Sequence, residues 1–293
     1  MPDRRRLVWR PWFWLAPAVA LLVIYLVYPT INTIYLSFLG PQSTGFVGVE
    51  NYLFALTSPD MLSAFRNNLL WLIFFTLCTV TFGLIIAVLF DRVRYETAVK
   101  ALIFLPMAIS YEAAGVIWKL MYEFEPAGRP QTGTVNAILV SLIPDFEPQA
   151  WLVNQSTNNA ALIAIGIWMW TGFCMVILSA GLKSIPVELM EAARVDGANE
   201  WQIFRGVTIP LLRPTIAVVT TTMVINVLKV FDIVYIMTNG NLGTEVIANR
   251  MYKEMFNFRH FGRASTIAVI LLLAVIPVMY YNIERFREQE ALR

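Results

Sequence analysis

Five polar or charged residues lie within segments that are otherwise strongly apolar: Glu112, Lys119, Asn226, Lys229 and Asp232. If such segments cross a bilayer, each ionisable group costs a few kcal/mol to insert, so it either serves a functional site or has a buried partner. Lys119 follows Glu112 by seven residues on the same helical face, while Lys229 and Asp232 are three apart and could pair locally. Asn226, one turn earlier, is a neutral donor and acceptor suited to hydroxyl groups. The residue types predict hydrogen bonding rather than bond-breaking chemistry.

Other kinds of chemistry have little support in the sequence. His260 is the one histidine, and Cys78 and Cys174 lie inside apolar runs, so no set of metal ligands can be assembled and we expect no metal site. Neither a GxxxxGK[ST] phosphate loop nor a GxGxxG fingerprint occurs, so we expect no cofactor and no nucleotide hydrolysis in this chain. No Lys/Arg tract suggests a nucleic-acid partner.

The composition is that of a membrane protein. Of the 293 residues, 58% are hydrophobic and 14% are charged, whereas soluble domains average about 45–50% apolar and about 25% charged residues. A helix that crosses the hydrocarbon needs about 20 mostly apolar residues. We therefore predict an all-α polytopic membrane protein with a transmembrane domain over residues 12–283 and six spans: residues 12–38, 69–90, 101–122, 161–182, 215–236 and 264–283. The first span is too long for a signal peptide and lacks a small-residue cleavage site, so it reads as an uncleaved anchor.

Basic residues predict the orientation of these spans, because cytoplasmic loops carry an excess of Lys and Arg. The outer loops at residues 39–68 and 123–160 hold only Arg66 and Arg129, although the last outer loop, with four basic residues, blurs the pattern. We therefore expect the N-terminus, residues 1–11, and the C-terminus, residues 284–293, in the cytoplasm. The Pro- and Gly-rich external loop at 123–160 reads as irregular, with one short helix.

A polar segment at residues 183–213 separates the fourth and fifth spans and carries the sequence EAARVDG, then VTIP. Pro186 suits the first turn of a helix and Gly197 suits a left-handed terminator, which gives a helix of about 16 Å. Asn199 can cap a second short helix, which we expect to end before Pro210. The predicted helix–turn–helix is too polar to span a bilayer, and its small residues allow a partner protein to approach closely.

The spacing of EAA, three residues, Gly, nine residues and then I-x-L-P, which reads VTIP here, resembles the cytoplasmic-loop signature of permeases of binding-protein-dependent ABC transporters. Val207 and Ile209 replace the usual Ile and Leu of that signature. The segments FDIVYIMTNG, residues 231–240, and FGRAS, residues 261–265, are typical of the maltose-type carbohydrate branch. Within it the chain is similar to subunits that import α-glucosides or glucosylglycerol. A second EAA that begins at Glu112 has the wrong Gly spacing. The resemblance covers essentially the whole chain and implies the type I ABC importer permease fold.

This resemblance implies that the 183–213 segment is a coupling element that docks on a cytoplasmic ATPase. Glu191 would be its polar anchor and Gly197 would permit its turn. The coupling residues it implies are Glu191, Ala192, Ala193, Asp196, Gly197 and Pro210. The alternative is a solvated loop with an accidental EAA match.

The resemblance also implies a translocation path. We expect Glu112, Asn226 and Asp232 to face it, with Trp168 or Trp170 available to stack on a sugar. The alternative is that Glu112 bonds another helix, that the lysines extend toward the outer interface and that the tryptophans only pack.

The resemblance finally implies partners and a location. One permease would form half of a carbohydrate path, so it needs a second permease, with which it would form a heterodimer, and an ATP-binding subunit dimer that uses ATP and Mg²⁺. An external sugar-binding protein would deliver the solute, and the complex would lie in the bilayer of a bacterial cell's inner membrane. One rival is an ion-coupled secondary sugar transporter, which should show inverted repeats. The other is a polytopic membrane enzyme, which would need clustered reactive side chains.

Overall fold

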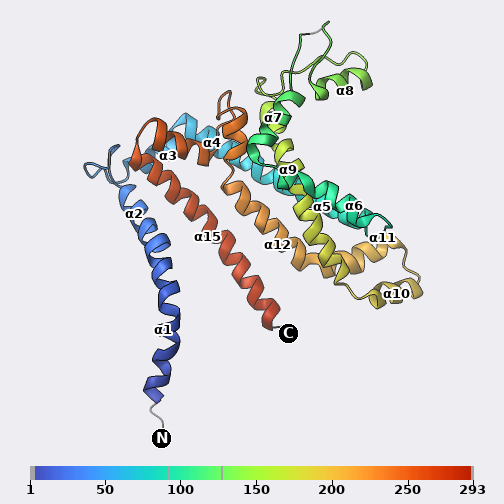
Figure 1. The fold of residues 1–293 in the computed structure, drawn as a ribbon, viewed down its shortest axis with the longest axis horizontal. Helices are drawn as coiled ribbons and strands as arrows, with labels where there is room; N and C mark the ends of the chain where they lie inside the picture. The colour runs from blue at the N-terminus through green and yellow to red at the C-terminus, as the bar shows by residue number, and fades with distance from the viewer. Residues whose placement is uncertain (1–3, 92, 127, 292–293) are drawn as a thin grey trace. The chain divides into compact units, whose positions relative to one another are not determined.

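Helices form nearly all of the regular structure. The computed structural model describes residues 4–91, 93–126 and 128–291 (Figure 1). Its described part contains no strand beyond one isolated bridge between Leu39 and Phe46. The chain divides into two units: unit 1 holds residues 1–58 and 251–272, and unit 2 holds residues 59–250 and 273–293.

Apolar helices of membrane-spanning length dominate both units. Five described helices qualify by length and composition: Phe13–Leu36, Pro59–Leu89, Asn158–Lys183, Glu200–Leu228 and Phe261–Tyr280. The span expected at residues 101–122 is instead a pair, Glu96–Ala108 and Tyr111–Met121, bent by 100°. Pro106 lies in a 3₁₀ turn before the break, Ile109 is extended, and Ser110 caps the second helix by accepting from Ala113 N. A proline and a cap residue thus end one helix and start another inside a single apolar run.

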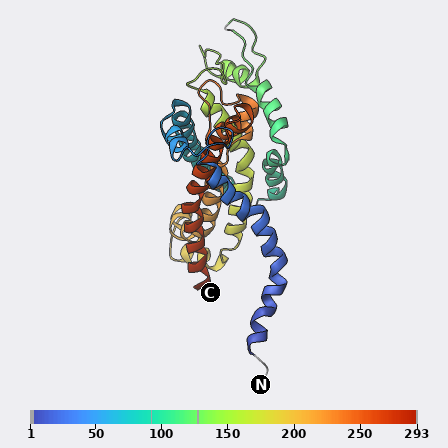
Figure 2. The same ribbon diagram turned by 90° about the vertical axis from the view of Figure 1, so that its left-hand side faces the viewer.

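Unit 1 contains the N-terminal span and the beginning of the last helix. Its elements are α1 (Arg4–Leu22), η1 (Val23–Val27), α2 (Tyr28–Leu36), α3 (Glu50–Thr57), η5 (Lys253–Asn257) and the start of α15 (Phe261–Ala291). The first three form one continuous helix (Figure 2), and none of its most apolar stretch is buried. Asn51 Nδ2 donates to Ser37 O at 2.9 Å and to Leu39 O at 2.8 Å, and Thr266 Oγ1 donates to Ser37 O at 3.1 Å. These bonds fix the segment after α2 against α3 and α15.

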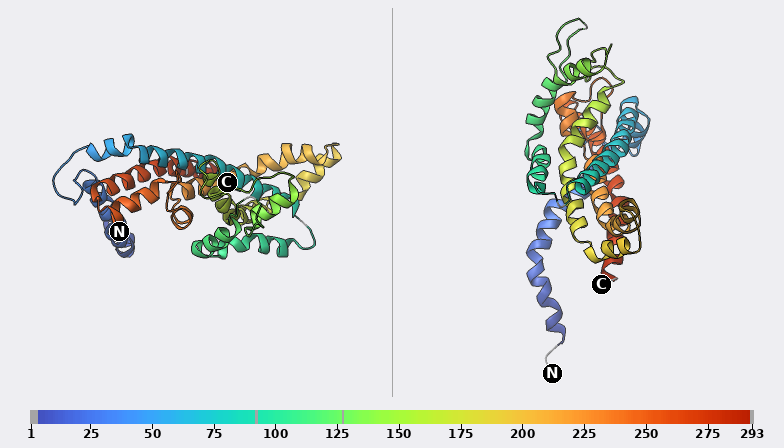
Figure 3. Two further views of the ribbon diagram at one scale, coloured as in Figure 1. Left: turned by 90° about the horizontal axis from the view of Figure 1, so that it is seen from above. Right: turned by 90° about the vertical axis from the view of Figure 1, so that its right-hand side faces the viewer.

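Unit 2 contains the remaining elements. They are α4 (Pro59–Leu70), η2 (Trp71–Phe75), α5 (Thr76–Leu89), α6 (Glu96–Phe104), η3 (Leu105–Ala108), α7 (Tyr111–Met121), α8 (Thr134–Leu142), α9 (Asn158–Lys183), α10 (Val187–Val195), α11 (Glu200–Ile203), η4 (Phe204–Thr208), α12 (Ile209–Leu228) and α13 (Asp232–Met237), with α14 (Ile247–Tyr252) at its boundary. The short helix expected in the 123–160 loop is α8. It lies at the end of unit 2 opposite α10 and α11 (Figures 1 and 3).

Glycines bring the helices of unit 2 close together. A Cβ added at Gly83 of α5 would lie 2.6 Å from Cys174 Cβ and 2.9 Å from Met175 N of α9. At Gly181 of α9, an added Cβ would lie 2.7 Å from Leu212 Cδ1 of α12. Small residues at helix crossings allow this backbone approach, which drives helix association in membranes. The α5–α9–α12 packing is therefore the core that supports the sites described below.

We expect Gly83→Ala to lower the unfolding temperature of the detergent-solubilised protein. The added methyl meets backbone atoms that cannot move aside, and overpacking of this kind costs about 1–3 kcal/mol. Gly206→Ala is the matched control, because nothing lies within 4 Å of a Cβ added there. Thermal unfolding followed by circular dichroism would measure both. Equal unfolding temperatures for the two variants would contradict the close α5–α9 contact.

The loop at residues 183–213 differs from its prediction in one respect. Asn199 caps α11 as expected: its Oδ1 accepts from Gln202 N at 2.9 Å, and Gln202 Oε1 accepts from Asn199 N at 2.8 Å. However, the expected end of this helix before Pro210 is wrong, because the helix continues to Leu228. A π turn, in which Ile209 N–H donates to Phe204 O, directly precedes the proline. That wider turn accommodates the ring and the missing N–H at the start of α12.

Candidate functional site

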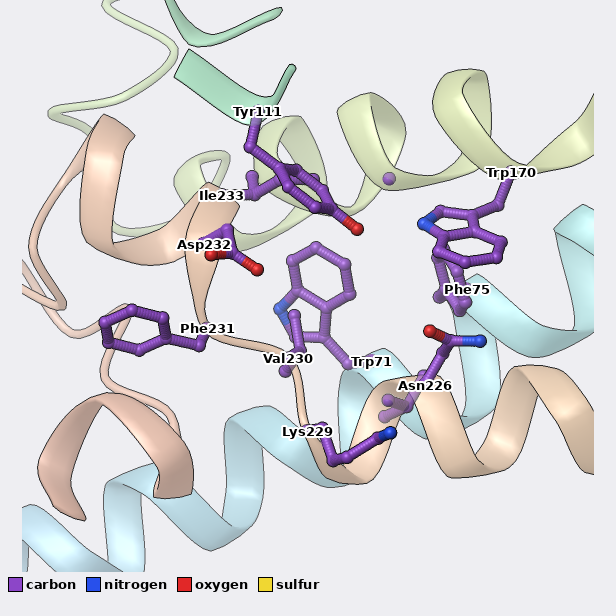
Figure 4. Close-up of a pocket in the computed structure, with 12 residues that line it drawn as sticks. Trp71, Phe75, Tyr111, Trp170, Asn226, Lys229, Val230, Phe231, Asp232 and Ile233 are labelled. Atoms are coloured by element: carbon purple, nitrogen blue, oxygen red, sulfur yellow. The ribbon is translucent and has the colours of Figure 1, made fainter. Parts of the chain in front are cut away.

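A pocket of about 260 Å³ opens within unit 2 where α12 ends (Figure 4). The polar groups that line it come from different elements: Tyr111 begins α7, Asn226 lies in the last turn of α12, and Asp232 begins α13. Aromatic rings complete the wall, with Trp71 from η2 and Trp170 from α9. Aromatic surfaces with a few convergent polar groups are the usual composition of a small-ligand site.

The break between α12 and α13 places two opposite charges at the pocket. Lys229 is the C-cap residue of α12, where the helix dipole favours a cation, and Asp232 lies in the first turn of α13, where it favours an anion. The local pairing considered for these residues does not occur, since no ion pair joins them in the described part of the chain. Each charged residue instead lies at the end of a helix, and both side chains line the pocket.

Trp71 provides the clearest indication of a ligand. Its side chain is only 1% exposed, and its indole Nε1–H has no hydrogen-bond partner among the described residues. A buried donor left unpaired costs about 1–3 kcal/mol, so such a group calls for an explanation. Its element, η2, is a π turn inside a long helix, a feature that is frequent at functional sites. Figure 4 shows the Trp71 ring among Tyr111, Asp232 and Asn226.

Gly166 of α9 makes room for the aromatic wall. A Cβ added there would lie 2.8 Å from Trp71 Cζ3 and 3.1 Å from Phe75 Cδ2. Both rings are buried from solvent. Asn226 is also oriented, since its Nδ2 donates to Thr222 O at 3.1 Å and its Oδ1 remains as an acceptor. The pocket is therefore largely pre-formed.

The structure brings together three of the five residues predicted for the path: Asn226, Asp232 and Trp170. It does not bring Glu112 or Trp168 to this pocket. Glu112 lies in the first turn of α7 with its side chain exposed, because the 100° bend moves it out of the expected mid-span position. Trp168 instead packs edge-on against Trp118, with ring centroids 5.6 Å apart.

Sequence reasoning missed Trp71, Phe75 and Tyr111. Trp71 and Phe75 lie in a continuous apolar run, where nothing distinguishes them from ordinary core aromatics. One sequence feature could have identified Tyr111: Pro106 inside an apolar segment marks a helix break, and Tyr111 starts the next helix.

The second candidate site is the exposed helix α10 with its turn. Gly197 has φ +86°, and Ala198 N donates to Ala193 O at 3.0 Å, which is the αL-terminated helix end expected from the sequence. Glu191, Ala192, Asp196 and Gly197 are exposed, and the neighbouring Val195 is 87% exposed. A helix with exposed apolar and small residues beside a charged one presents a surface for a partner protein.

An ion pair holds α10 to α11. Arg194 Nε donates to Glu200 Oε1 at 2.8 Å, and Arg194 Nη2 donates to Glu200 Oε2 at 3.3 Å. The Glu200 carboxylate raises the pKa of the Arg194 guanidinium through these bonds, so the pair stays charged. Both side chains are well exposed, so the pair contributes little stability and mainly orients the two helices.

Taken with the apolar helices, these two sites define a polytopic membrane protein that has a solute-sized pocket and a separate exposed helix. The family model of the binding-protein-dependent transport system inner membrane component matches residues 79–289. The chain therefore belongs to this family of membrane-embedded transport components, and it is not an enzyme of the polytopic class considered above.

Curated relatives and solved structures agree with this assignment. The chain is 61% identical over 280 residues to the osmoprotective compounds uptake permease protein GgtC of Synechocystis sp., covering 96% of this chain and all of that protein. It is 48% identical over 275 residues to the alpha-glucoside transport system permease protein AglF of Rhizobium meliloti, covering 94% and 81%. A crystal structure of a bacterial ABC transporter involved in alginate import superposes with a TM-score of 0.81 at 22% identity, covering 95% and 96% of the two chains. This last likeness confirms the type I ABC importer permease fold.

Proposed function

We propose that this chain is the permease subunit of an ATP-driven importer and forms half of the path for a carbohydrate or a related polyhydroxyl solute. The observation that carries the proposal is the exposed helix α10, whose EAA residues and left-handed Gly197 lie at one end of the spans. The permease relatives named for osmoprotective compounds and for alpha-glucosides support the solute class. Hydroxyl-rich solutes also suit the polar groups of the pocket.

The partners follow from this function. The chain has no phosphate loop, so the ATP and Mg²⁺ belong to a dimer of ATP-binding subunits that α10 and its neighbours contact through Glu191, Ala192, Ala193, Asp196 and Gly197. Pro210, further along, lies in the first turn of α12, within the continuous helix Glu200–Leu228. A second permease subunit completes the path as a heterodimer, and an external sugar-binding protein delivers the solute. The solved alginate transporter, which is similar in fold, was captured with a periplasmic protein bound to an alginate pentasaccharide.

The proposed orientation places both termini and α10 in the cytoplasm. Cytoplasmic loops carry an excess of Lys and Arg, and the basic residues of the loop that contains α10 support its cytoplasmic location. Within unit 2, the C-terminal end of α15 and α10 lie at the same end, and the α8 loop lies at the other (Figure 2). An even number of spans, counting the bent pair as one, is consistent with termini on one side.

The proposed solute site is the pocket at the α12–α13 break. Trp71 and Trp170 supply faces on which a sugar ring can stack, and the unpaired Trp71 N–H supplies a donor for a hydroxyl oxygen. Asn226 and Asp232 supply acceptors. Glu112, exposed on α7, does not line this pocket, and its role in the path stays a prediction.

We expect Trp71→Phe to weaken solute recognition while leaving the fold intact. Phe retains a ring and removes the N–H, so the loss should be about 1 kcal/mol, roughly fivefold in the half-saturating concentration for solute. The measurement is uptake of radiolabelled glucosylglycerol and trehalose by proteoliposomes that contain the complete transporter. Trp168→Phe is the matched control, because Trp168 does not line the pocket. An equal effect of both substitutions would place the solute elsewhere.

A further inference from the structure

A charged cluster links the end of α9 to the start of α6. Glu96 Oε1 lies 2.5 Å from Lys100 Nζ and 2.5 Å from Lys183 Nζ. Lys100 Nζ also hydrogen-bonds Ser179 Oγ of α9. Lys100 and Glu96 are only 14% and 16% exposed, whereas Lys183 is 54% exposed. The partial burial strengthens the attraction between these groups compared with a fully solvated pair.

The helix ends favour this arrangement. Glu96 lies in the first turn of α6, and Lys183 lies in the last turn of α9, so each charge also matches its own helix dipole. Lys183 is followed within four residues by α10, the proposed docking helix. The cluster therefore lies at the end of α9 that connects to α10, where a displacement of α10 is passed on to α9.

The other end of α6 is held to α9 by close packing. A Cβ added at Gly172 of α9 would lie 2.5 Å from Ile103 O and 2.7 Å from Phe104 Cα, so the two backbones touch there. The charged cluster at one end and this backbone contact at the other hold α6 against α9. After α6 the chain continues through η3 and the bend to Tyr111, which lines the pocket.

Two of the segments that line the pocket are α9 and α7. Gly166 and Trp170 belong to α9, which is continuous with the approach to α10, but Tyr111 belongs to α7. A displacement of α10 that is transmitted through α9 reaches Tyr111 when α6 moves with α9; a second route runs through the continuous helix Glu200–Leu228 to α13, whose Ile236 packs against Gly115 of α7. Physical coupling between distant sites requires such a contiguous chain of packed and bonded elements.

We propose that Glu96 and Lys183 are positioning residues that make α6 follow α9, so that the movement of α10 driven by the ATPase reaches the Tyr111 side of the pocket. The inference rests on the proposed function. In this role the pair couples ATP hydrolysis to solute movement, whereas α10 itself binds the ATPase.

The test uses proteoliposomes that contain the two permeases, the ATP-binding dimer and the external binding protein, supplied with Mg-ATP and radiolabelled trehalose or glucosylglycerol. Lys183→Met is the main variant, because Lys183 is the most exposed member and its loss leaves Glu96 with Lys100. We expect basal ATP hydrolysis and subunit assembly to persist, while solute transported per ATP falls about fivefold. The conservative variant Lys183→Arg, which keeps a positive charge beside Glu96, should retain the wild-type ratio.

Arg94→Met is the matched control, since it removes an exposed basic side chain two residues before α6. It should leave the transport ratio unchanged. An unchanged ratio in Lys183→Met, or a ratio that falls as far in Lys183→Arg as in Lys183→Met, would overturn the inference. If the wild-type complex shows no hydrolysis stimulated by the loaded binding protein, the proposed function is itself wrong and the inference fails with it.

Discussion

Glu191→Lys is expected to abolish solute uptake and solute-stimulated ATP hydrolysis without changing the fold of this chain. The Glu191 side chain is exposed on α10, so its replacement removes no internal contact of a buried group. At a protein interface, reversing the charge of an anchoring residue costs about 2 kcal/mol or more, roughly 30-fold in affinity. The measurements are copurification of the ATP-binding subunits, ATP hydrolysis with loaded binding protein, and uptake by proteoliposomes.

Glu147→Lys is the control for this variant. It makes the same change in charge at an exposed position on the α8 loop, at the opposite end of unit 2 from α10. In Glu147→Lys, ATP hydrolysis stimulated by the loaded binding protein should match that of the wild type. Full copurification and hydrolysis in Glu191→Lys would remove α10 as the docking element, and equal losses in both variants would point to a general effect of charge.

Gly166→Ala should sharply reduce uptake by closing the pocket from its α9 side. The added methyl would meet Trp71 Cζ3 at 2.8 Å and Phe75 Cδ2 at 3.1 Å, and both of these rings line the pocket. Overpacking of this kind costs about 1–3 kcal/mol, and here it also removes ligand volume from a site of about 260 Å³. Initial rates of uptake against solute concentration would show a raised half-saturating concentration and a lowered maximal rate.

Gly83→Ala separates this effect from a general loss of stability. It crowds α5 against α9 in the same manner but does not line the pocket. Both variants should unfold at lower temperatures, and only Gly166→Ala should change the half-saturating solute concentration. The same change in both would show that α9 packing, rather than the pocket, determines recognition.

Much of the fold was predictable because it depends on local chemistry. The apolar runs determine which segments are helices of spanning length, since every backbone polar group in a bilayer must be satisfied within the helix or a barrel. The left-handed Gly197 and the Asn199 cap were also predictable, because each depends on the conformational or hydrogen-bonding properties of a single residue. The bend before Tyr111 and the π turn before Pro210 were not predicted, because they depend on how the chain accommodates a proline within a longer helix.

The solute pocket was predictable only in part. Asn226 and Asp232 stood out because polar groups are costly in apolar segments, and the structure places both at the pocket. Glu112 stood out for the same reason, yet the bend exposes it on α7. Trp71 could not be distinguished, because only the assembled helices show that its N–H lacks a partner.

The sequence by itself therefore determined the membrane class, the exposed helix α10 and its turn, since composition, a capping residue and a glycine act within a few residues. Only the tertiary structure decided which side chains share a pocket and that Glu96 meets Lys183. Those pairs are separated by long stretches of chain, and their contacts depend on where Gly83, Gly166 and Gly172 let the helices approach. Helix-crossing geometry of this kind has no signature in a single sequence.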